Sequence, residues 1–232
     1  MSDVILEVCN LSKTFAEGDR QRRVFSNLNA SIRKGEFVVL LGRSGSGKST
    51  LLNLISGIDL PSGGEVRIGG RNLTGMTEQQ RTLFRRDHIG FVFQFYNLIP
   101  TLNVMENLLL PLELKKSLDA DSQRRALDIL QQVGLEDRSA SYPDRLSGGE
   151  QQRVAICRAL IHNPLVLLAD EPTGNLDAES GGEVLALLDQ LIRKGRMTAL
   201  MVTHSAEVAR LADRVITIKD GGLVETAAST EA

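Results

Sequence analysis

The 232-residue sequence has no tryptophan, only two cysteines and little net charge, with 27 basic and 29 acidic residues. The charge balance removes any global electrostatic case for nucleic-acid binding. No apolar run approaches the roughly 20 residues that a transmembrane helix needs. Cys9 and Cys157 lie far apart, outside any metal-binding spacing, and indicate a buried apolar cysteine and a helix cysteine in a reducing cytoplasm. The length predicts one large domain, or a core with a subdomain, and the 42% hydrophobic residues can form a substantial core.

The sequence does contain a glycine-rich stretch with the spacing G-x-x-x-x-G-K-[ST]. An apolar run precedes it and a helix-like run follows it, which is the strand–loop–helix context that the motif requires. Its glycines let backbone N–H groups turn toward phosphate oxygens, Lys48 supplies a positive charge, and the Ser49 hydroxyl can bind Mg²⁺. The residues of this predicted phosphate loop are Gly42, Arg43, Ser44, Gly45, Ser46, Gly47, Lys48, Ser49 and Thr50.

Two further apolar runs end in polar side chains that suit the same chemistry. One ends in Asp170 and Glu171, and the other ends in Thr203 and His204. The carboxyl ends of parallel strands lie at one edge of a sheet, where ligands bind. We expect Asp170 to hold Mg²⁺ opposite Ser49, and Glu171 to orient and polarise an attacking water. His204 would contact the γ-phosphate; chance exposure of these strand-end residues is the plainer alternative.

Phe15 and Gln94 each allow two interpretations on local grounds. Phe15 could stack on an adenine ring, or it could belong to the core. Gln94 follows a buried-looking strand and could reach a metal ion or a water at the phosphate site, or face solvent.

The segment Leu146–Arg153, with the sequence LSGGEQQR, opens a predicted helix that runs to about His162. Ser147 and Glu150 fit the S-x-x-E capping box, so the serine could be only an N-cap. A helix N-terminus that follows glycines is also a ready anion site. Local physics does not separate these two interpretations.

Alternating strand-like and helix-like runs predict an α/β fold with a mostly parallel sheet. We predict a loop or hairpin tip at Ala16–Arg23, between two N-terminal strands. Residues 101–144 carry no strand signal and read as a helical subdomain, with a kink or break at Pro111. The remaining residues, 1–100 and 145–232, would form the α/β core.

The C-terminal part of the chain is predicted to close the fold with a hairpin. Its two strands are expected at Val215–Lys219 and Gly222–Val224. The tail Glu225–Ala232 is expected to be frayed.

In this order, the motifs resemble those of an ATP-binding cassette (ABC) ATPase over essentially the whole chain. Leu146–Arg153 is similar to the LSGGQ-type signature of that family, with Glu150 where many members have Gln. Phe15 lies where the family has its adenine-stacking aromatic residue, often a Tyr. The other matching elements, in family order, are the phosphate loop, Gln94, Asp170-Glu171, Asn175-Leu176-Asp177 and His204.

The resemblance implies a P-loop NTPase (RecA-like) core with an N-terminal antiparallel β subdomain and an inserted α-helical subdomain. It also implies an ATP hydrolase that uses ATP and Mg²⁺ and works as a head-to-tail homodimer around two ATP molecules. The phosphate loop of one copy would face the signature residues of the other, Ser147, Gly148, Gly149 and Glu150. Asn175 and Asp177 would form a loop at the dimer interface. The implied Mg²⁺ ligands are Ser49, Gln94 and Asp170.

Two stretches, Phe93–Pro100 and Leu168–Asp177, are similar to the lipoprotein-release and macrolide-export ATPases of the bacterial cell envelope. Ser205 is a small departure, since many members carry Asp after the histidine. The subgroup implies a separate transmembrane permease subunit, a peripheral position on the cytoplasmic face of the inner membrane, and export or release of a lipoprotein or other hydrophobic compound. No nucleic-acid partner is expected.

Three other functions were weighed for the same motifs. A non-transporting ABC ATPase of the cell-division type, which signals across the membrane, would use the same residues and stays open. A DNA-associated ABC ATPase would carry coiled-coil or zinc-binding insertions, but the interval between Lys48 and Ser147 holds neither heptads nor cysteine pairs. A translation factor of the superfamily would need two cassettes in one chain.

Overall fold

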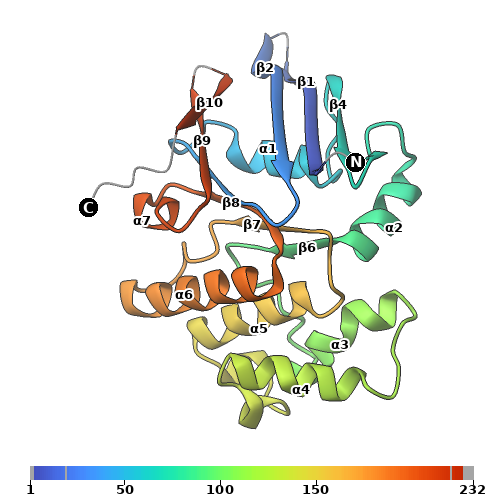
Figure 1. The fold of residues 1–232 in the computed structure, drawn as a ribbon, viewed down its shortest axis with the longest axis vertical. Coiled ribbons are helices and arrows are strands. Elements are labelled where there is room, and N and C mark those ends of the chain that lie inside the picture. Colours follow the sequence, from blue (N-terminus) through green and yellow to red (C-terminus); the bar gives the residue numbers. More distant parts are fainter. Residues whose placement is uncertain (1–2, 19, 220, 227–232) are drawn as a thin grey trace.

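A computed structural model describes residues 3–18, 20–219 and 221–226, which form two β-sheets with helices around them (Figure 1). The smaller sheet is antiparallel, with the strand order β2-β1-β4-β5. The N-terminal part of the chain forms β1 and β2, which pair as a long antiparallel hairpin. The strands are β1 (Val4–Glu17), β2 (Arg20–Arg33), β4 (Gly63–Ile68) and β5 (Arg71–Asn72).

The larger sheet has six strands in the order β10-β9-β3-β8-β7-β6. All neighbouring strands are parallel except β10, which pairs antiparallel with β9. This arrangement places the ends of β3, β7 and β8 at one edge, as the sequence predicts. The strands are β3 (Phe37–Leu41), β6 (Ile89–Val92), β7 (Val166–Asp170), β8 (Thr198–Thr203), β9 (Arg214–Lys219) and β10 (Gly222–Thr226).

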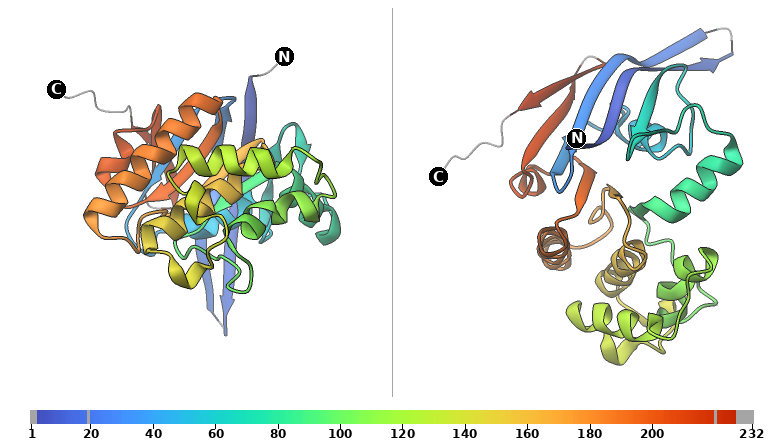
Figure 2. Two further views of the ribbon diagram at one scale, coloured as in Figure 1. Left: turned by 90° about the horizontal axis from the view of Figure 1, so that it is seen from below. Right: turned by 45° about the vertical axis from the view of Figure 1, so that its right-hand side comes forward.

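Helices cover both faces of the larger sheet, and α3 and α4 lie at the end of the molecule opposite the antiparallel sheet (Figure 2). The α-helices are α1 (Lys48–Ile55), α2 (Glu78–His88), α3 (Val104–Leu114), α4 (Ser122–Gln132), α5 (Gly148–Leu160), α6 (Ala178–Gly195) and α7 (Ala206–Ala209). Two short 3₁₀ helices, η1 (Glu136–Arg138) and η2 (Pro143–Arg145), follow α4.

The alternation of side chains along β3 divides the interior into two apolar cores. Val38 and Leu40 pack in the core that α1 shares with the antiparallel sheet. Phe37 and Val39 pack in the other core, beneath α3 to α6. Since both faces of the strand are buried, β3 is apolar throughout, which is typical of a central parallel strand. The phosphate loop follows this rigid strand directly.

The structure sharpens or corrects three local predictions. At Ala16–Arg23 the hairpin tip is confirmed and the loop is wrong, because cross-strand pairing continues to Glu17 opposite Arg20. At Pro111 the predicted break is wrong, since α3 runs through it to Leu114. Residues 225 and 226 belong to β10, so that part of the frayed tail is wrong, and residues 227–232 lie outside the described residues. Within the described part of the chain, no helix has both the length and the apolar character needed to cross a bilayer.

Candidate functional site

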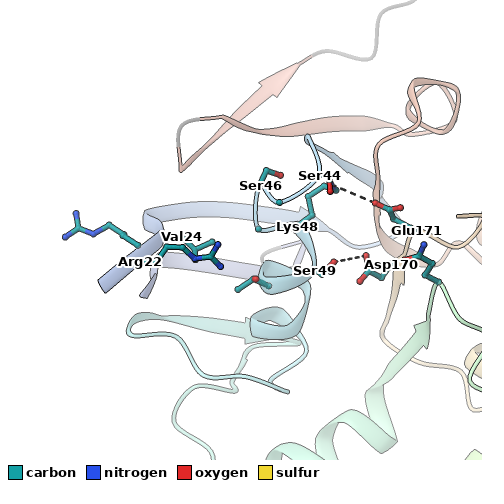
Figure 3. Close-up of a pocket in the computed structure, with 13 residues that line it drawn as sticks. Arg22, Val24, Ser44, Ser46, Lys48, Ser49, Asp170 and Glu171 are labelled. Carbon is teal, nitrogen blue, oxygen red and sulfur yellow. Dashed lines mark hydrogen bonds and ion pairs between the residues drawn. The ribbon is translucent and has the colours of Figure 1, made fainter. Parts of the chain in front are cut away.

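A cavity of about 680 Å³ opens where the phosphate loop, the β1–β2 hairpin and the end of β7 meet (Figure 3). Most of its wall is polar and comes from segments that are far apart in the sequence. The lining residues are Arg22, Arg23, Val24, Ser44, Gly45, Ser46, Gly47, Lys48, Ser49, Thr50, Gln94, Asp170 and Glu171.

The phosphate loop depends on glycine where it enters α1. Gly47 has φ = 96°, which favours glycine, and a Cβ there would lie 2.7 Å from Phe25 Cζ and from Val24 Cγ1. Gly47 is the N-cap of α1 and offers no side chain to the first-turn N–H groups. The positive end of the α1 dipole therefore faces the loop without a capping side chain, which suits a phosphate.

Lys48 is held inside the loop, with only 6% of its surface exposed. Its Nζ donates to the carbonyl oxygens of Gly42 at 2.8 Å and Arg43 at 3.1 Å. It also lies 4.0 Å from Glu171 Oε1. The buried hydroxyl of Ser46 has no hydrogen-bond partner among the residues that the structure describes. A positive charge and an unused polar group thus lie together in the same loop.

The Ser49 hydroxyl donates to Asp170 Oδ1 at 3.3 Å, which brings two residues 121 positions apart into contact (Figure 3). Burial raises the pKa of Asp170, and the hydrogen bond from Ser49 partly offsets this. The Ser49 hydroxyl and the Asp170 carboxylate both offer oxygen atoms, the ligands that Mg²⁺ prefers. Within the described residues no three His, Cys, Asp or Glu side chains form a metal cluster.

Glu171 has a left-handed backbone, with φ = 43°, directly after β7. Its N–H donates to the carbonyl oxygen of Val202 in β8 at 2.9 Å. Its carboxylate Oε2 lies 3.1 Å from His204 Nδ1, at the end of the neighbouring strand. The structure therefore brings the predicted acid and the predicted histidine into direct contact.

Gln94 lines the cavity and is joined to the loop that follows β7. Its Nε2 donates to Asn175 Oδ1 at 3.4 Å, and Asn175 Nδ2 donates to the Gln94 carbonyl oxygen at 3.0 Å. A Cβ at Gly174 would lie 2.9 Å from Gln94 Nε2, so the glycine permits this close approach. Asp177 caps α6 by accepting from Ser180 N at 2.9 Å.

Ser147 and Glu150 form the predicted capping box at the start of α5. Ser147 N donates to Glu150 Oε2 at 2.7 Å, and Glu150 N donates to the Ser147 hydroxyl at 3.2 Å. The bond from the Ser147 backbone N–H lowers the pKa of Glu150. Ser147 is exposed, and none of the four predicted signature residues lines the cavity. The N-cap role is confirmed, while the anion site stays a prediction.

Other predicted residues lie beside the cavity rather than in its wall. Gly42, Arg43 and His204 line a neighbouring hollow of about 750 Å³. Phe15 is absent from the wall of the first cavity, and the Lys13 ammonium lies 4.8 Å from the centre of its ring. Its adenine contact stays a prediction.

No motif in the sequence points to Arg22, Arg23 and Val24, which the hairpin carries to the cavity wall. In the structure, strand pairing sets Arg22 opposite Phe15. Extending both N-terminal strands to a short turn would have placed these residues near Phe15, whereas a loop over this stretch pairs none of them.

The site as a whole can bind the phosphates of a nucleotide and polarise a water beside them. It combines an uncapped helix N-terminus and a buried lysine with an oxygen pair for a cation. It adds an acid in contact with a histidine. Fold and site together define a P-loop ATP-binding cassette.

Comparison with known proteins supports this class directly. The ABC transporter family matches residues 25–174. The uncharacterized ABC transporter ATP-binding protein Rv0986 of Mycobacterium tuberculosis is 54% identical, over 95% of this chain and 89% of its own length. The lipoprotein-releasing system ATP-binding protein LolD of Chromohalobacter salexigens is 43% identical, over 97% and 95%. The macrolide export ATP-binding/permease protein MacB of Escherichia coli is 45% identical, over 95% of this chain but 34% of its own length.

A solved structure matches the fold in full. The ATP-binding cassette MJ0796, described as dimeric and bound to ADP and Pi in a post-hydrolysis state, superposes with a TM-score of 0.87. It is 41% identical and covers 98% of this chain and 100% of its own. The chain belongs to the ABC transporter family, as an ATP-binding subunit that hydrolyses ATP. The predicted likeness to the lipoprotein-release and macrolide-export subgroup is confirmed.

Proposed function

We propose that two copies of this chain bind two ATP molecules head to tail and drive a separate membrane subunit. The observation that carries the proposal is that the cavity brings together the phosphate loop, Gln94, Asp170 and Glu171 but no signature residue. Ser147, the N-cap of α5, is exposed, so a second copy can reach it. Each ATP would then lie between the phosphate loop of one copy and the Ser147 segment of the other.

In this proposal the residues of one copy bind and orient ATP. The residues Gly42–Thr50 wrap the phosphates with backbone N–H groups, and the Lys48 ammonium turns from the loop carbonyls to the β- and γ-phosphates. Phe15 stacks on the adenine, and Arg22 and Arg23 add positive charge along the wall. Contact with phosphate also gives the Ser46 hydroxyl a partner.

The Mg²⁺ site would be formed by Ser49, Asp170 and Gln94. When bound, the ion neutralises charge that develops on the transferring phosphate. Asp170 is ready for this role because its half-buried carboxylate already faces the Ser49 hydroxyl at 3.3 Å. Gln94 lines the same cavity and is held by Asn175.

Glu171 would orient and polarise the attacking water, and His204 would contact the γ-phosphate. The 3.1 Å contact between them holds the carboxylate toward the histidine at the end of β8. The left-handed backbone at Glu171 directs the side chain away from the strand, into the cavity. Loss of the γ-phosphate then removes the bridge to the second copy, and the two copies separate.

The output would be read by a separate transmembrane permease at the cytoplasmic face of the inner membrane. Phe95, which follows Gln94, is 69% exposed and offers an apolar contact next to the site. The similarity to LolD supports export or release of an envelope substrate, such as a lipoprotein or another hydrophobic compound.

The test of the sandwich is the Glu171→Gln variant, analysed by size-exclusion chromatography with light scattering. We expect it to bind ATP as tightly as wild type and to run as a dimer with ATP. Its rate of hydrolysis should fall by about 100-fold or more. With ADP it should run as a monomer. A variant that stays monomeric at saturating ATP would contradict the sandwich.

The test of the membrane partner is co-purification from detergent-solubilised membranes of the source organism, with the Glu171→Gln chain as bait. A subunit with membrane helices and a large extracytoplasmic domain is the expected partner. A partner that is a cell-wall enzyme regulator would instead favour signalling without transport. DNA-stimulated hydrolysis with no membrane partner would contradict the proposal.

A further inference from the structure

Gln152 is fully buried, although it lies on the helix that starts at the exposed Ser147. Its side chain leaves α5 and reaches the two polypeptide segments that enter the ATP site. Nε2 donates to the carbonyl oxygen of Pro172 at 2.5 Å and to that of Phe93 at 3.4 Å. A long polar side chain in such a position must be used, because burying an amide without hydrogen bonds is costly.

The two carbonyl oxygens fix the orientation of the amide. Only the NH₂ group carries two hydrogens, so it alone can serve Phe93 and Pro172 together. A flipped amide would set its oxygen against both carbonyl oxygens. Oε1 is the group left over, and it is buried without a partner in the described chain. The Gln152 amide therefore bonds to these two carbonyl oxygens, while its own oxygen stays without a hydrogen bond among the described residues.

Both acceptors lie next to residues of the ATP site. Phe93 precedes Gln94, and Pro172 follows Glu171. The two segments also meet through Gln94 and Asn175, in the exposed pair of hydrogen bonds described above. Gln152 joins the same two segments a second time, through buried hydrogen bonds from α5.

The same helix holds the Gln94 segment at a second point. Arg158 NH1 donates to the Asn97 carbonyl oxygen at 2.7 Å, and its NH2 donates to that of Tyr96 at 3.1 Å. Both of these Arg158 bonds go to the Gln94 segment, whereas Gln152 binds both segments. Gln152 therefore relates the position of α5 to the position of Glu171.

We infer that Gln152 is a positioning residue for ATP hydrolysis, which sets Glu171 and Gln94 relative to the start of α5. The inference rests on the proposed roles of those residues and adds one that the motifs do not assign. Pro172 follows the left-handed residue directly, so the bond to its carbonyl oxygen restrains the backbone that aims the Glu171 carboxylate. Through this bond, Gln152 transmits movement of α5 on contact with a second copy directly to the backbone beside Glu171.

The test compares Gln152→Met and Gln152→Asn with the control Gln151→Met. Met has nearly the same shape but no donor, and Asn keeps the amide but is shorter by one methylene, so it cannot span both carbonyl oxygens. Gln151 is the matched control because it lies on the same helix and its Nε2 donates only to Leu146 O, at 3.1 Å. For each variant kcat, KM, the affinity for a fluorescent ATP analogue and the melting temperature are measured.

We expect both Gln152 variants to lower kcat by about 10- to 100-fold, as a misplaced catalytic group does, with KM and nucleotide affinity within twofold of wild type. In the Glu171→Gln background they should still form the ATP-dependent dimer. A kcat equal to that of Gln151→Met would overturn the inference. So would a loss of kcat that only parallels a loss of nucleotide affinity and of stability. If Gln152→Met does not fold, Gln152→Asn decides alone.

The same experiment separates this inference from the proposed function. If Glu171→Gln neither slows turnover nor traps a dimer, the proposed roles fail whatever the Gln152 variants do. If Glu171→Gln behaves as proposed and Gln152→Met hydrolyses at the rate of its control, only the role of Gln152 fails.

Discussion

The N-termini of α1 and α5 both follow glycine- or serine-containing loops, yet they are built in opposite ways. Helix α1 has Gly47 as its N-cap, no side-chain cap and no acidic residue in its first turn. Helix α5 has Ser147 as its N-cap, a complete capping box and Glu150 in its first turn. One helix leaves its N–H groups to a ligand, and the other satisfies two of them itself.

This difference suggests an order of events for the proposed dimer. The start of α1, with the buried Lys48, is a complete site for phosphate before any partner arrives. The start of α5 is stable without a ligand, and the carboxylate of Glu150 opposes an anion there. ATP would thus bind α1 first, and α5 of a second copy would add a weaker contact that hydrolysis can break.

The largest expected effect comes from Lys48→Ala, which removes the charge at the start of α1. Nucleotide affinity should fall by about 100-fold, because the phosphates lose their one buried cationic contact in the loop. Isothermal titration calorimetry with ATP measures it. Arg81→Ala is the matched control, since Arg81 is equally buried and its NH1 donates to the Met76 carbonyl oxygen outside the cavity. Unchanged ATP affinity in Lys48→Ala would contradict the assignment of the loop.

The second effect concerns stability, and comes from Ser147→Ala at the start of α5. Loss of the N-cap should lower the free energy of unfolding by about 1 kcal/mol, while ATP still binds the monomer normally. Thr77→Ala is the matched control, because Thr77 and Gln80 form the same box at α2. Both variants should lose similar stability in chemical denaturation. Only Ser147→Ala should weaken the ATP-dependent dimer, and equal weakening by both would contradict the account.

A smaller effect is expected from Asp170→Asn. Burial raises the pKa of Asp170 in the folded protein, so the folded state binds a proton more readily than the unfolded state. Between the ordinary and the raised value, stability therefore falls as pH rises, and the ionised carboxylate is a cost at neutral pH. Without Mg²⁺, Asp170→Asn should melt at the wild-type temperature or a few degrees above it. Added Mg²⁺ and ATP should stabilise wild type more than the variant in the same thermal scan.

The smallest effect is expected from Glu150→Gln in the Glu171→Gln background. The change removes one negative charge from the start of α5, so the ATP-dependent dimer should tighten by about two- to fivefold at low salt. The difference should shrink at high salt because the charges are screened. The box itself should survive, since Gln80 accepts from Thr77 N at 2.9 Å in the same role. Sedimentation measures the dimer constant, and a weaker dimer at low salt would contradict this reading of Glu150.

Much of the site was predictable because strand order and strand direction determine it. Ser49 and Asp170 meet across 121 positions for the reason the sequence suggested, which is that parallel strands end at one edge. The capping box at Ser147 was predictable because it is local, and the structure has it. The role of the same serine toward a second copy cannot be read from one chain.

What the sequence could not predict depends on long-range pairing and on exceptions to local rules. Arg22 and Arg23 reach the cavity only because the hairpin is longer than its polar composition suggests. Pro111 is tolerated inside α3, where the local rule predicts a break. Arg196, rather than a glycine, takes the left-handed position after α6. Gln152 looks like an ordinary helix residue until its two carbonyl partners are known.

In the proposed dimer, Ser147 completes the ATP site of another copy and not its own. The double variant Ser147→Arg/Glu171→Gln tests this role, with ATP affinity and molecular mass measured on the same sample. We expect the variant to bind ATP as tightly as Glu171→Gln alone, yet to remain a monomer at saturating ATP. An ATP-dependent dimer would show that Ser147 has no place in the interface, and loss of ATP binding by the monomer would show that it acts in cis; either result contradicts the account.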